Sequence, residues 1–159
     1  MAYPALEIAK WFVNAIDRES GESMSPLKVQ KLLYYAEAWA QLALERDLFN
    51  ENIQACAHGP AVPEVFHEFK KFGWEAIPTL RPALKIDSET TEILKQVLDV
   101  YDEFSAETLE HMTHSDKPWL DARGDLPVEA RREKVIPKAA MKEYFLNKYG
   151  GLVDEKADT

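Results

Sequence analysis

The stretch Ser25-Pro26-Leu27-Lys28-Val29-Gln30-Lys31-Leu32-Leu33-Tyr34-Tyr35-Ala36-Glu37-Ala38-Trp39 decides the fold of this chain. Ser25 is a residue type that caps helix N-termini by accepting a hydrogen bond from an unpaired backbone N–H. Pro26 is tolerated at the first helical position, where its missing N–H would have no partner anyway. We therefore expect a helix that begins directly after Ser25 and runs to about Glu45 or Arg46.

This helix carries more large apolar side chains than one core-facing stripe needs. Steps of 100° per residue place a broad apolar face on one side of it, formed by Val29, Leu32, Leu33, Ala36, Trp39, Ala40, Ala43 and Leu44. Four further apolar or aromatic residues fall outside that face: Leu27, Tyr34, Tyr35 and Leu42. Either the helix is central and covered by several elements, or part of it contacts a partner protein.

The remaining pattern predicts further amphipathic helices and little strand. We expect helices from Pro4 to Ser20-Gly21, Val62 to Gly73, Ser88 to Phe104, a short one capped by Ser105, a turn or short helix at Trp119-Leu120, and a last one from Pro137 to Gly150-Gly151. Residues 52–58 and 74–80 could form two short strands, while the stretch from Arg123 to Val135 is charged and expected to be mostly exposed.

The predicted fold class is therefore mainly α: a compact single-domain helical bundle around a central second helix, with a small β-hairpin at most. A length of 159 residues suits one domain. We assign residues 1–150 to this domain and residues 151–159 to a disordered acidic tail.

Composition narrows the possible functions. The net charge is −9, and such a surface repels phosphate backbones, so nucleic-acid binding by the isolated protein is disfavoured. A single cysteine permits neither an intrachain disulfide nor a cysteine-based zinc cluster. Neither an export signal nor a membrane-spanning apolar run is evident, so we expect a cytoplasmic protein without membrane association.

Motifs for catalysis and metal binding fail on inspection. The six glycines form no phosphate-binding loop, and there is no GxSxG motif. A zinc-protease HExxH motif beginning at His67 fails because Lys71 stands at the place of the second histidine. His111 and His114 are three residues apart on a predicted helix, which is too few ligands for a specific metal site. We expect no catalytic residue, no bound metal and no cofactor.

Three separated motifs resemble those of one protein family, and they occur in its order. They are Ser25 to Tyr35, then His58-Gly59-Pro60-Ala61-Val62-Pro63-Glu64-Val65-Phe66, then Leu109-Glu110-His111-Met112-Thr113-His114 followed by Pro118-Trp119. Over roughly residues 5 to 120 the chain resembles the SocA-type antitoxins, which carry the Panacea domain and were earlier grouped with phage-associated GepA-like proteins. Ala61 and Met112 depart from the family pattern, where a branched apolar residue and a leucine are more usual.

The resemblance implies a mostly helical bacterial or prophage antitoxin without enzymatic activity. Such a protein binds and neutralises a protein toxin encoded by a neighbouring gene. The motif residues and the apolar residues outside the main helix face are our candidates for partner binding: Leu27, Lys31, Tyr34, Tyr35, Trp39, Leu42, His58, Gly59, Pro60, Pro63, His114 and Trp119. Lys31 and Tyr34 are the strongest of these, because Lys31 would project a charge beside an aromatic ring that lies off the main face.

Other functions remain open at this point. An adaptor or chaperone that delivers a client toxin to a cellular protease would need a similar contact surface. A DNA-binding autoregulator is disfavoured by the net charge and by the lack of a basic recognition helix. A metal-dependent enzyme would depend on His111 and His114.

Overall fold

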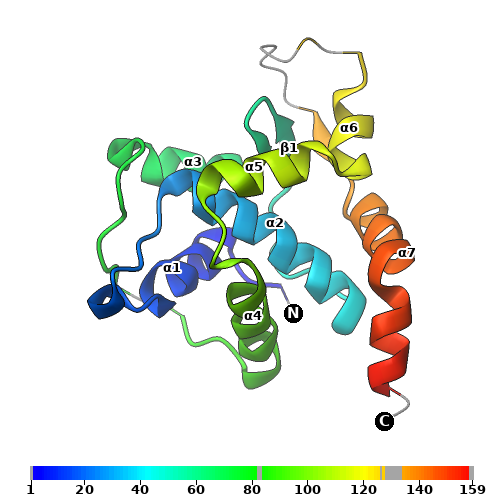
Figure 1. Cartoon of the computed structure of the whole chain (residues 1–159), viewed down its shortest axis with the longest axis horizontal. Coiled ribbons are helices and arrows are strands. Elements are labelled where there is room, and N and C mark those ends of the chain that lie inside the picture. Colours follow the sequence, from blue (N-terminus) through cyan, green and yellow to red (C-terminus); the bar gives the residue numbers. More distant parts are fainter. Residues whose placement is uncertain (1, 82–83, 126, 128–133, 158–159) are drawn as a thin grey trace.

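The second helix, α2 (Pro26–Ala43), passes through the middle of the computed structural model, which describes residues 2–81, 84–125, 127 and 134–157 (Figure 1). It begins as predicted, because the Ser25 hydroxyl oxygen accepts a hydrogen bond from the backbone N–H of Lys28 at 3.2 Å. Buried residues lie on every side of α2, and several of them are polar. This burial is expected of a helix that other elements cover all round.

The other helices pack around α2 and confirm the predicted mainly α class. They are α1 (Ala5–Ala15), α3 (Pro63–Phe69), α4 (Ser88–Tyr101), α5 (Ala106–His114), α6 (Lys117–Arg123) and α7 (Lys138–Ala157), with 3₁₀ turns at Arg18–Ser20 and Lys70–Phe72. Four helices contribute most of the cover on α2, namely α1, α4, α5 and α7. Their buried faces join one hydrophobic core, which includes Ile8, Phe12, Leu94, Met141 and Phe145.

A buried ion pair fastens α7 to α2. The Glu37 carboxylate, which has no exposed surface, lies 2.9 Å from the Lys138 ammonium. It also accepts a hydrogen bond from the backbone N–H of Leu48 at 2.7 Å. Burial raises the pKa of Glu37, although these partners oppose the rise. The pair therefore joins the central helix α2 to α7.

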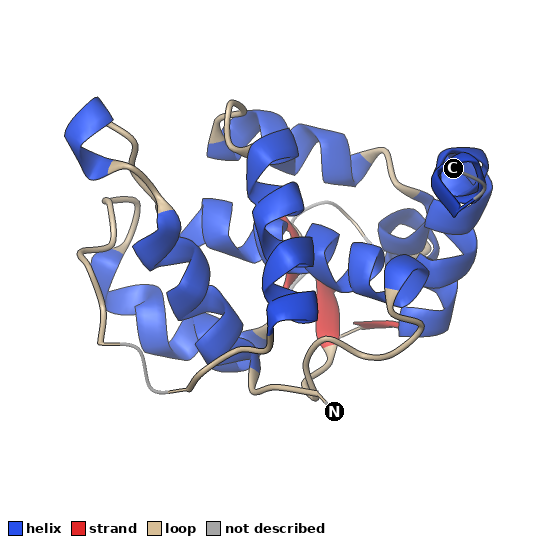
Figure 2. Cartoon of the chain, turned by 90° about the horizontal axis from the view of Figure 1, so that it is seen from below, coloured by secondary structure: helices blue, strands red, loops and turns tan. Residues whose placement is uncertain are grey.

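A small antiparallel sheet lies among the helices, with strand order β2-β1-β3 (Figure 2). The strands are β1 (Ile53–Cys56), β2 (Gly59–Ala61) and β3 (Val135–Ile136). The predicted first strand is confirmed, but the predicted second strand over residues 74–80 is wrong. In that segment the backbone N–H of Ile77 donates to the carbonyl of Met24 at 2.8 Å, so the segment is bound to the loop before α2. The sheet is also larger than the predicted hairpin, because β3 pairs with β1.

The last helix extends beyond its predicted end. The structure continues α7 to Ala157, past Gly150-Gly151, so these glycines do not stop the helix. Residues 158–159, at the end of the predicted tail, and residues 126 and 128–133, in the predicted charged stretch, lie outside the described part. The assignment of residues 1–150 to one domain and the disorder of residues 151–159 in solution stay predictions.

Candidate partner-binding site

Two polar side chains of α2 hold the second strand of the hairpin and the residue that follows it. Gln30 makes a reciprocal pair with Val62: its amide nitrogen donates to the Val62 carbonyl at 3.1 Å, and its amide oxygen accepts from the Val62 N–H at 2.7 Å. The Lys31 ammonium donates to the Pro60 carbonyl at 2.9 Å. Only 1% of Lys31 is exposed. The first sequence motif is thus joined to the second inside the protein.

Three side chains of α5 and α6 bind consecutive carbonyls at the end of the first strand and the start of the turn. Arg123 donates to the Ala55 carbonyl at 3.1 Å, and the Trp119 indole N–H donates to the Cys56 carbonyl at 2.8 Å. The Nε2 atom of His114 lies 3.0 Å from the Ala57 carbonyl oxygen, and its ring stacks on Trp119 with 4.4 Å between the ring centroids. We refer to Gln30, Lys31, His114, Trp119 and Arg123 as the hairpin clamp.

The turn between the two strands requires glycine. Gly59 has a φ of +100°, a left-handed conformation that side chains rarely adopt. A Cβ atom at Gly59 would lie 2.7 Å from the Thr113 hydroxyl oxygen and 2.9 Å from Cε of Lys31. Gly59 therefore lets the turn bend and also lets α2 and α5 approach it closely.

His58 brings the same turn to the surface. Its Nδ1 atom lies 2.6 Å from a carboxylate oxygen of Glu110 in α5, and 67% of its side chain is exposed. Its ring also meets the Trp74 ring edge-to-face at 6.1 Å between centroids. Trp74 is itself 73% exposed. Exposed aromatic surface beside a tight turn is typical of protein–protein contacts.

Burial changes the protonation of two members of the hairpin clamp. Burial lowers the pKa of Lys31 to about 7, although the charges of Cys56 and Glu110 oppose this change. Burial also lowers the pKa of His114. Both side chains are consequently biased towards the uncharged form, in which His114 can still donate one hydrogen bond.

The structure corrects the premise that Lys31 and Tyr34 project from the helix surface. Lys31 lies in the hairpin clamp, and Tyr34 has no exposed surface. The Tyr34 hydroxyl donates to Oδ2 of Asp116 at 3.1 Å, and the Tyr144 hydroxyl donates to Oδ1 of the same carboxylate at 3.1 Å. Burial raises the pKa of both Tyr34 and Asp116. This network joins α2, α6 and α7.

The other candidates from α2 contact the helices rather than the hairpin clamp. The Tyr35 ring stacks on Tyr101 of α4 at 4.0 Å, and burial raises the pKa of Tyr101 to about 12. The Trp39 indole N–H donates to the Tyr101 hydroxyl at 3.3 Å. Leu42 is buried, whereas Leu27 is half-buried.

Of the predicted binding residues, His58 is the one that is largely exposed. Gly59, Pro60 and Trp119 are buried, and Pro63, His114, Trp39 and Leu27 are half-buried. Gly59, Pro60, Lys31, His114 and Trp119 are brought together at the hairpin. A direct contact of any candidate with a partner stays a prediction.

Sequence reasoning missed four residues of this region. Gln30 was not among the predicted binding residues, and the prediction that the stretch from Arg123 onward is mostly exposed is wrong at Arg123, which is 4% exposed. Glu110 and Trp74 were not connected to His58, because they approach it from other elements. Only Gln30 carried a usable signal, since it lies in a helix that is apolar on several sides.

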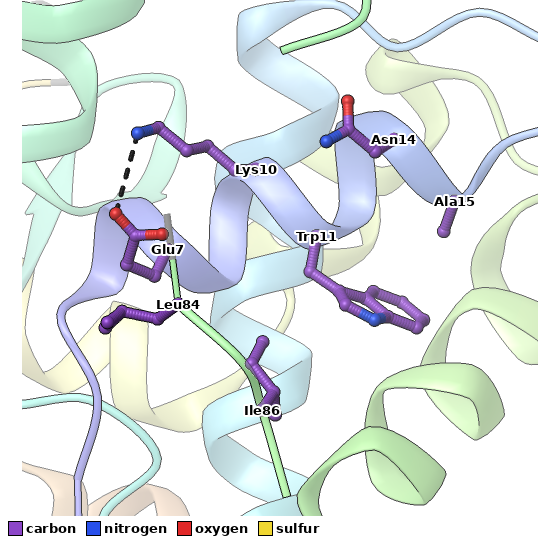
Figure 3. A pocket seen from close by; sticks show the side chains of 7 residues that line it. All are labelled: Glu7, Lys10, Trp11, Asn14, Ala15, Leu84 and Ile86. Atoms are coloured by element: carbon purple, nitrogen blue, oxygen red, sulfur yellow. Dashed lines mark ion pairs between the residues drawn. The ribbon is translucent and has the colours of Figure 1, made fainter. Parts of the chain in front are cut away.

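Elsewhere in the described part the structure has a surface pocket beside α1. A pocket between α1 and residues 84–86 is lined by Glu7, Lys10, Trp11, Asn14, Ala15, Leu84 and Ile86 (Figure 3). At its rim Glu7 and Lys10 form an ion pair at 3.5 Å. Among the described residues, no group of three or more His, Cys, Asp or Glu side chains could hold a metal ion. None of the described helices is long and apolar enough to cross a bilayer.

A comparison with protein families identifies the domain that these motifs form. The model described as "Antitoxin SocA-like, Panacea domain" matches residues 29–120, which is more than half of the chain. The matched region begins within α2 and includes the hairpin, α3, α4, α5 and most of α6. No curated protein and no solved structure matches the chain.

Proposed function

The chain belongs to the SocA-like antitoxin family with a Panacea domain, and from this premise we propose that it neutralises a cognate protein toxin by direct binding. The family match is the observation that carries the proposal. It includes most of the three sequence motifs and four of the five residues of the hairpin clamp. A toxin encoded by a neighbouring gene is the expected partner.

The exposed tip of the hairpin is the part of the motif region that we propose for toxin contact. His58 and Trp74 offer aromatic surface there, and Glu110 restrains His58. In this proposal the buried motif residues act indirectly. Lys31, His114 and Trp119 keep the strand carbonyls in place, so that the turn is presented in one conformation.

The proposed role needs no catalysis, since members of this family are not typically enzymes. The antitoxin would act in the cytoplasm, where its toxin is made. The net charge of −9 favours a basic partner surface and disfavours DNA as a partner of the isolated protein.

Co-expression with the neighbouring gene tests the proposed function. We expect that gene alone to stop growth, and we expect growth to return when this chain is present. The purified proteins should form a stable complex. In the cells, the amount of toxin should be the same with and without this chain. A neighbouring product that is harmless alone, or toxic in the presence of this chain, would contradict the antitoxin function.

The contact surface needs its own test. The double variant His58→Ala/Trp74→Ala should bind the toxin at least tenfold more weakly, because it removes exposed aromatic surface without touching the core. Leu146→Ala is the matched control, since Leu146 is 49% exposed on α7. Equal affinity of the double variant and the wild-type protein would show that the toxin binds elsewhere.

The same cells distinguish neutralisation from delivery to a protease. An adaptor would lower the amount of toxin, and deletion of the responsible protease would restore it. A constant amount of inactive toxin supports direct neutralisation.

A further inference from the structure

The hairpin turn lies between two side chains whose charge depends on pH. Lys31 of α2 binds the Pro60 carbonyl, where β2 continues from the turn. His114 of α5 binds the Ala57 carbonyl, where β1 leads into the turn. The two contacts thus hold opposite ends of one short turn. The other three members of the hairpin clamp do not change charge near neutral pH.

Few groups could balance the positive charge of a protonated Lys31. The charged groups that act on it are Cys56 of β1, Glu110 of α5 and the neighbouring His114. No carboxylate oxygen in the described part lies within 4.0 Å of the Lys31 ammonium. A protonated Lys31 would therefore be a buried charge whose nearest hydrogen-bond partner is a neutral carbonyl.

The surroundings of His114 also oppose a second proton. Glu110 and the Ala57 carbonyl favour its charged form, whereas burial, Lys31 and His111 disfavour it. His58 competes for Glu110 through their close contact of 2.6 Å.

We propose that the turn formed by residues 57–60 is a pH-sensitive latch: it stays closed over Lys31 and His114 while both are uncharged, and it opens to solvent as they take up protons. Opening lets water reach the Lys31 ammonium and relieves the cost of burying its charge. Gly59 lies directly on the Lys31 side chain, so hydration of that side chain requires the turn to move. The latch is a property of the chain alone and does not depend on the proposed antitoxin function.

The direction of the effect follows from proton uptake. Burial lowers the pKa of Lys31 from 10.5 to about 7 in the closed form, whereas a hydrated lysine keeps its ordinary value. Between these two values the open form binds more protons than the closed form. Each fall of one pH unit in this window therefore favours opening by up to about tenfold. His114 adds to the effect below its ordinary pKa of 6.5.

Amide hydrogen exchange of the isolated protein between pH 6 and pH 9 tests the latch. Dividing each rate by the intrinsic rate at the same pH gives an opening constant for the amides of residues 54–62. We expect this constant to rise about tenfold per unit as the pH falls from 9 to 7. It should also exceed the constant for the middle of α2 at every pH, because the opening is local.

Two variants separate the contributions of the two side chains. Lys31→Met fills a similar volume without a charge, so its opening constant should not change between pH 9 and pH 7. His114→Gln keeps a donor for the Ala57 carbonyl but does not titrate; it should keep the change above pH 7 and lose the further change below pH 6.5.

The outcomes that overturn the latch are distinct from those that contradict the antitoxin. A pH-independent opening constant in the wild-type protein would overturn it. So would a constant equal to that of α2 throughout, because the hairpin would then open only when the whole chain unfolds. If Lys31→Met does not fold, these wild-type comparisons and the His114→Gln profile still decide the question. No toxin takes part in any of these measurements.

Discussion

At the scale of single residues, Gly59 is the position least tolerant of a side chain. Gly59→Ala forces alanine into a left-handed conformation and places its methyl group against Thr113 and Lys31. We expect a loss of about 2–4 kcal/mol in the free energy of unfolding, from backbone strain and overpacking together. Urea denaturation measures this loss.

Gly21→Ala is the matched control for this substitution. Gly21 has a similar φ of +92°, but a Cβ atom there would meet nothing within 4 Å. Gly21→Ala should lower the free energy of unfolding only by the backbone strain, about 1 kcal/mol. Equal losses at the two positions would mean that the close approach of Lys31 and Thr113 does not matter.

Lys31 should also make global stability depend on pH. Its pKa is about 7 when folded and near 10.5 when unfolded, so the unfolded chain binds more protons between these values. The free energy of unfolding should therefore rise from pH 7 to pH 10, by at most about 1.4 kcal/mol per unit. The difference between wild type and Lys31→Met, measured by denaturation at each pH, isolates this contribution. A difference that stays constant with pH would show that Lys31 is not buried in the uncharged form.

At the scale of secondary-structure elements, the attachment of α7 to α2 depends on a buried charge pair. Lys138→Met leaves the Glu37 carboxylate buried without its ammonium partner, which should cost about 3 kcal/mol at pH 7. The loss should shrink towards pH 5, because the pKa of Glu37 is already raised and a protonated carboxyl group needs no counter-charge. Thermal or urea unfolding at both pH values measures it. Lys142→Met, on the same helix, serves as the control and should change stability by less than about 0.5 kcal/mol.

Local signals in the sequence were sufficient for the starts of the helices but not for the end of α7, which continues past Gly150-Gly151. Ser25 and Ser105 accept the hydrogen bonds expected of N-caps, at Lys28 and Thr108. Strand pairing was predicted less well, since β3 has two residues and meets β1 some 80 residues earlier in the chain. No local pattern predicts such a short, distant partner.

The sequence motifs predicted that Lys31, Gly59, Pro60, His114 and Trp119 belong together, but not how they are arranged. The motifs do meet, yet Lys31 was interpreted as a surface charge because lysine is rarely buried. Its burial depends on the Pro60 carbonyl, which a helical projection of α2 alone does not include. Trp74 was assigned to a strand, and its contact with His58 joins two segments that are 16 residues apart in the sequence.

At the scale of the whole molecule, charge is unevenly distributed. Residues 87–114, which include α4 and α5, hold eight acidic residues and one basic residue, a net charge of −7 out of −9 for the chain. If a basic toxin is the partner, this field should accelerate its approach. We expect the association rate to fall several-fold between 50 and 500 mM salt, with little change in the dissociation rate. Stopped-flow binding separates the two rates, and an association rate that does not respond to salt would argue against a basic partner surface.

The central place of α2 has a consequence for synthesis on the ribosome. In the folded protein Glu37 pairs with Lys138, and Tyr35 contacts Phe145. These two partners are translated about 100 residues after α2. At about 5–20 residues per second, that delay lasts on the order of 5–20 s. During this time the nascent chain exposes the aromatic side chains of α2 to other proteins in the cell. The packing of α2, the helix with the clearest start signal, is thus completed only when α7 has been translated.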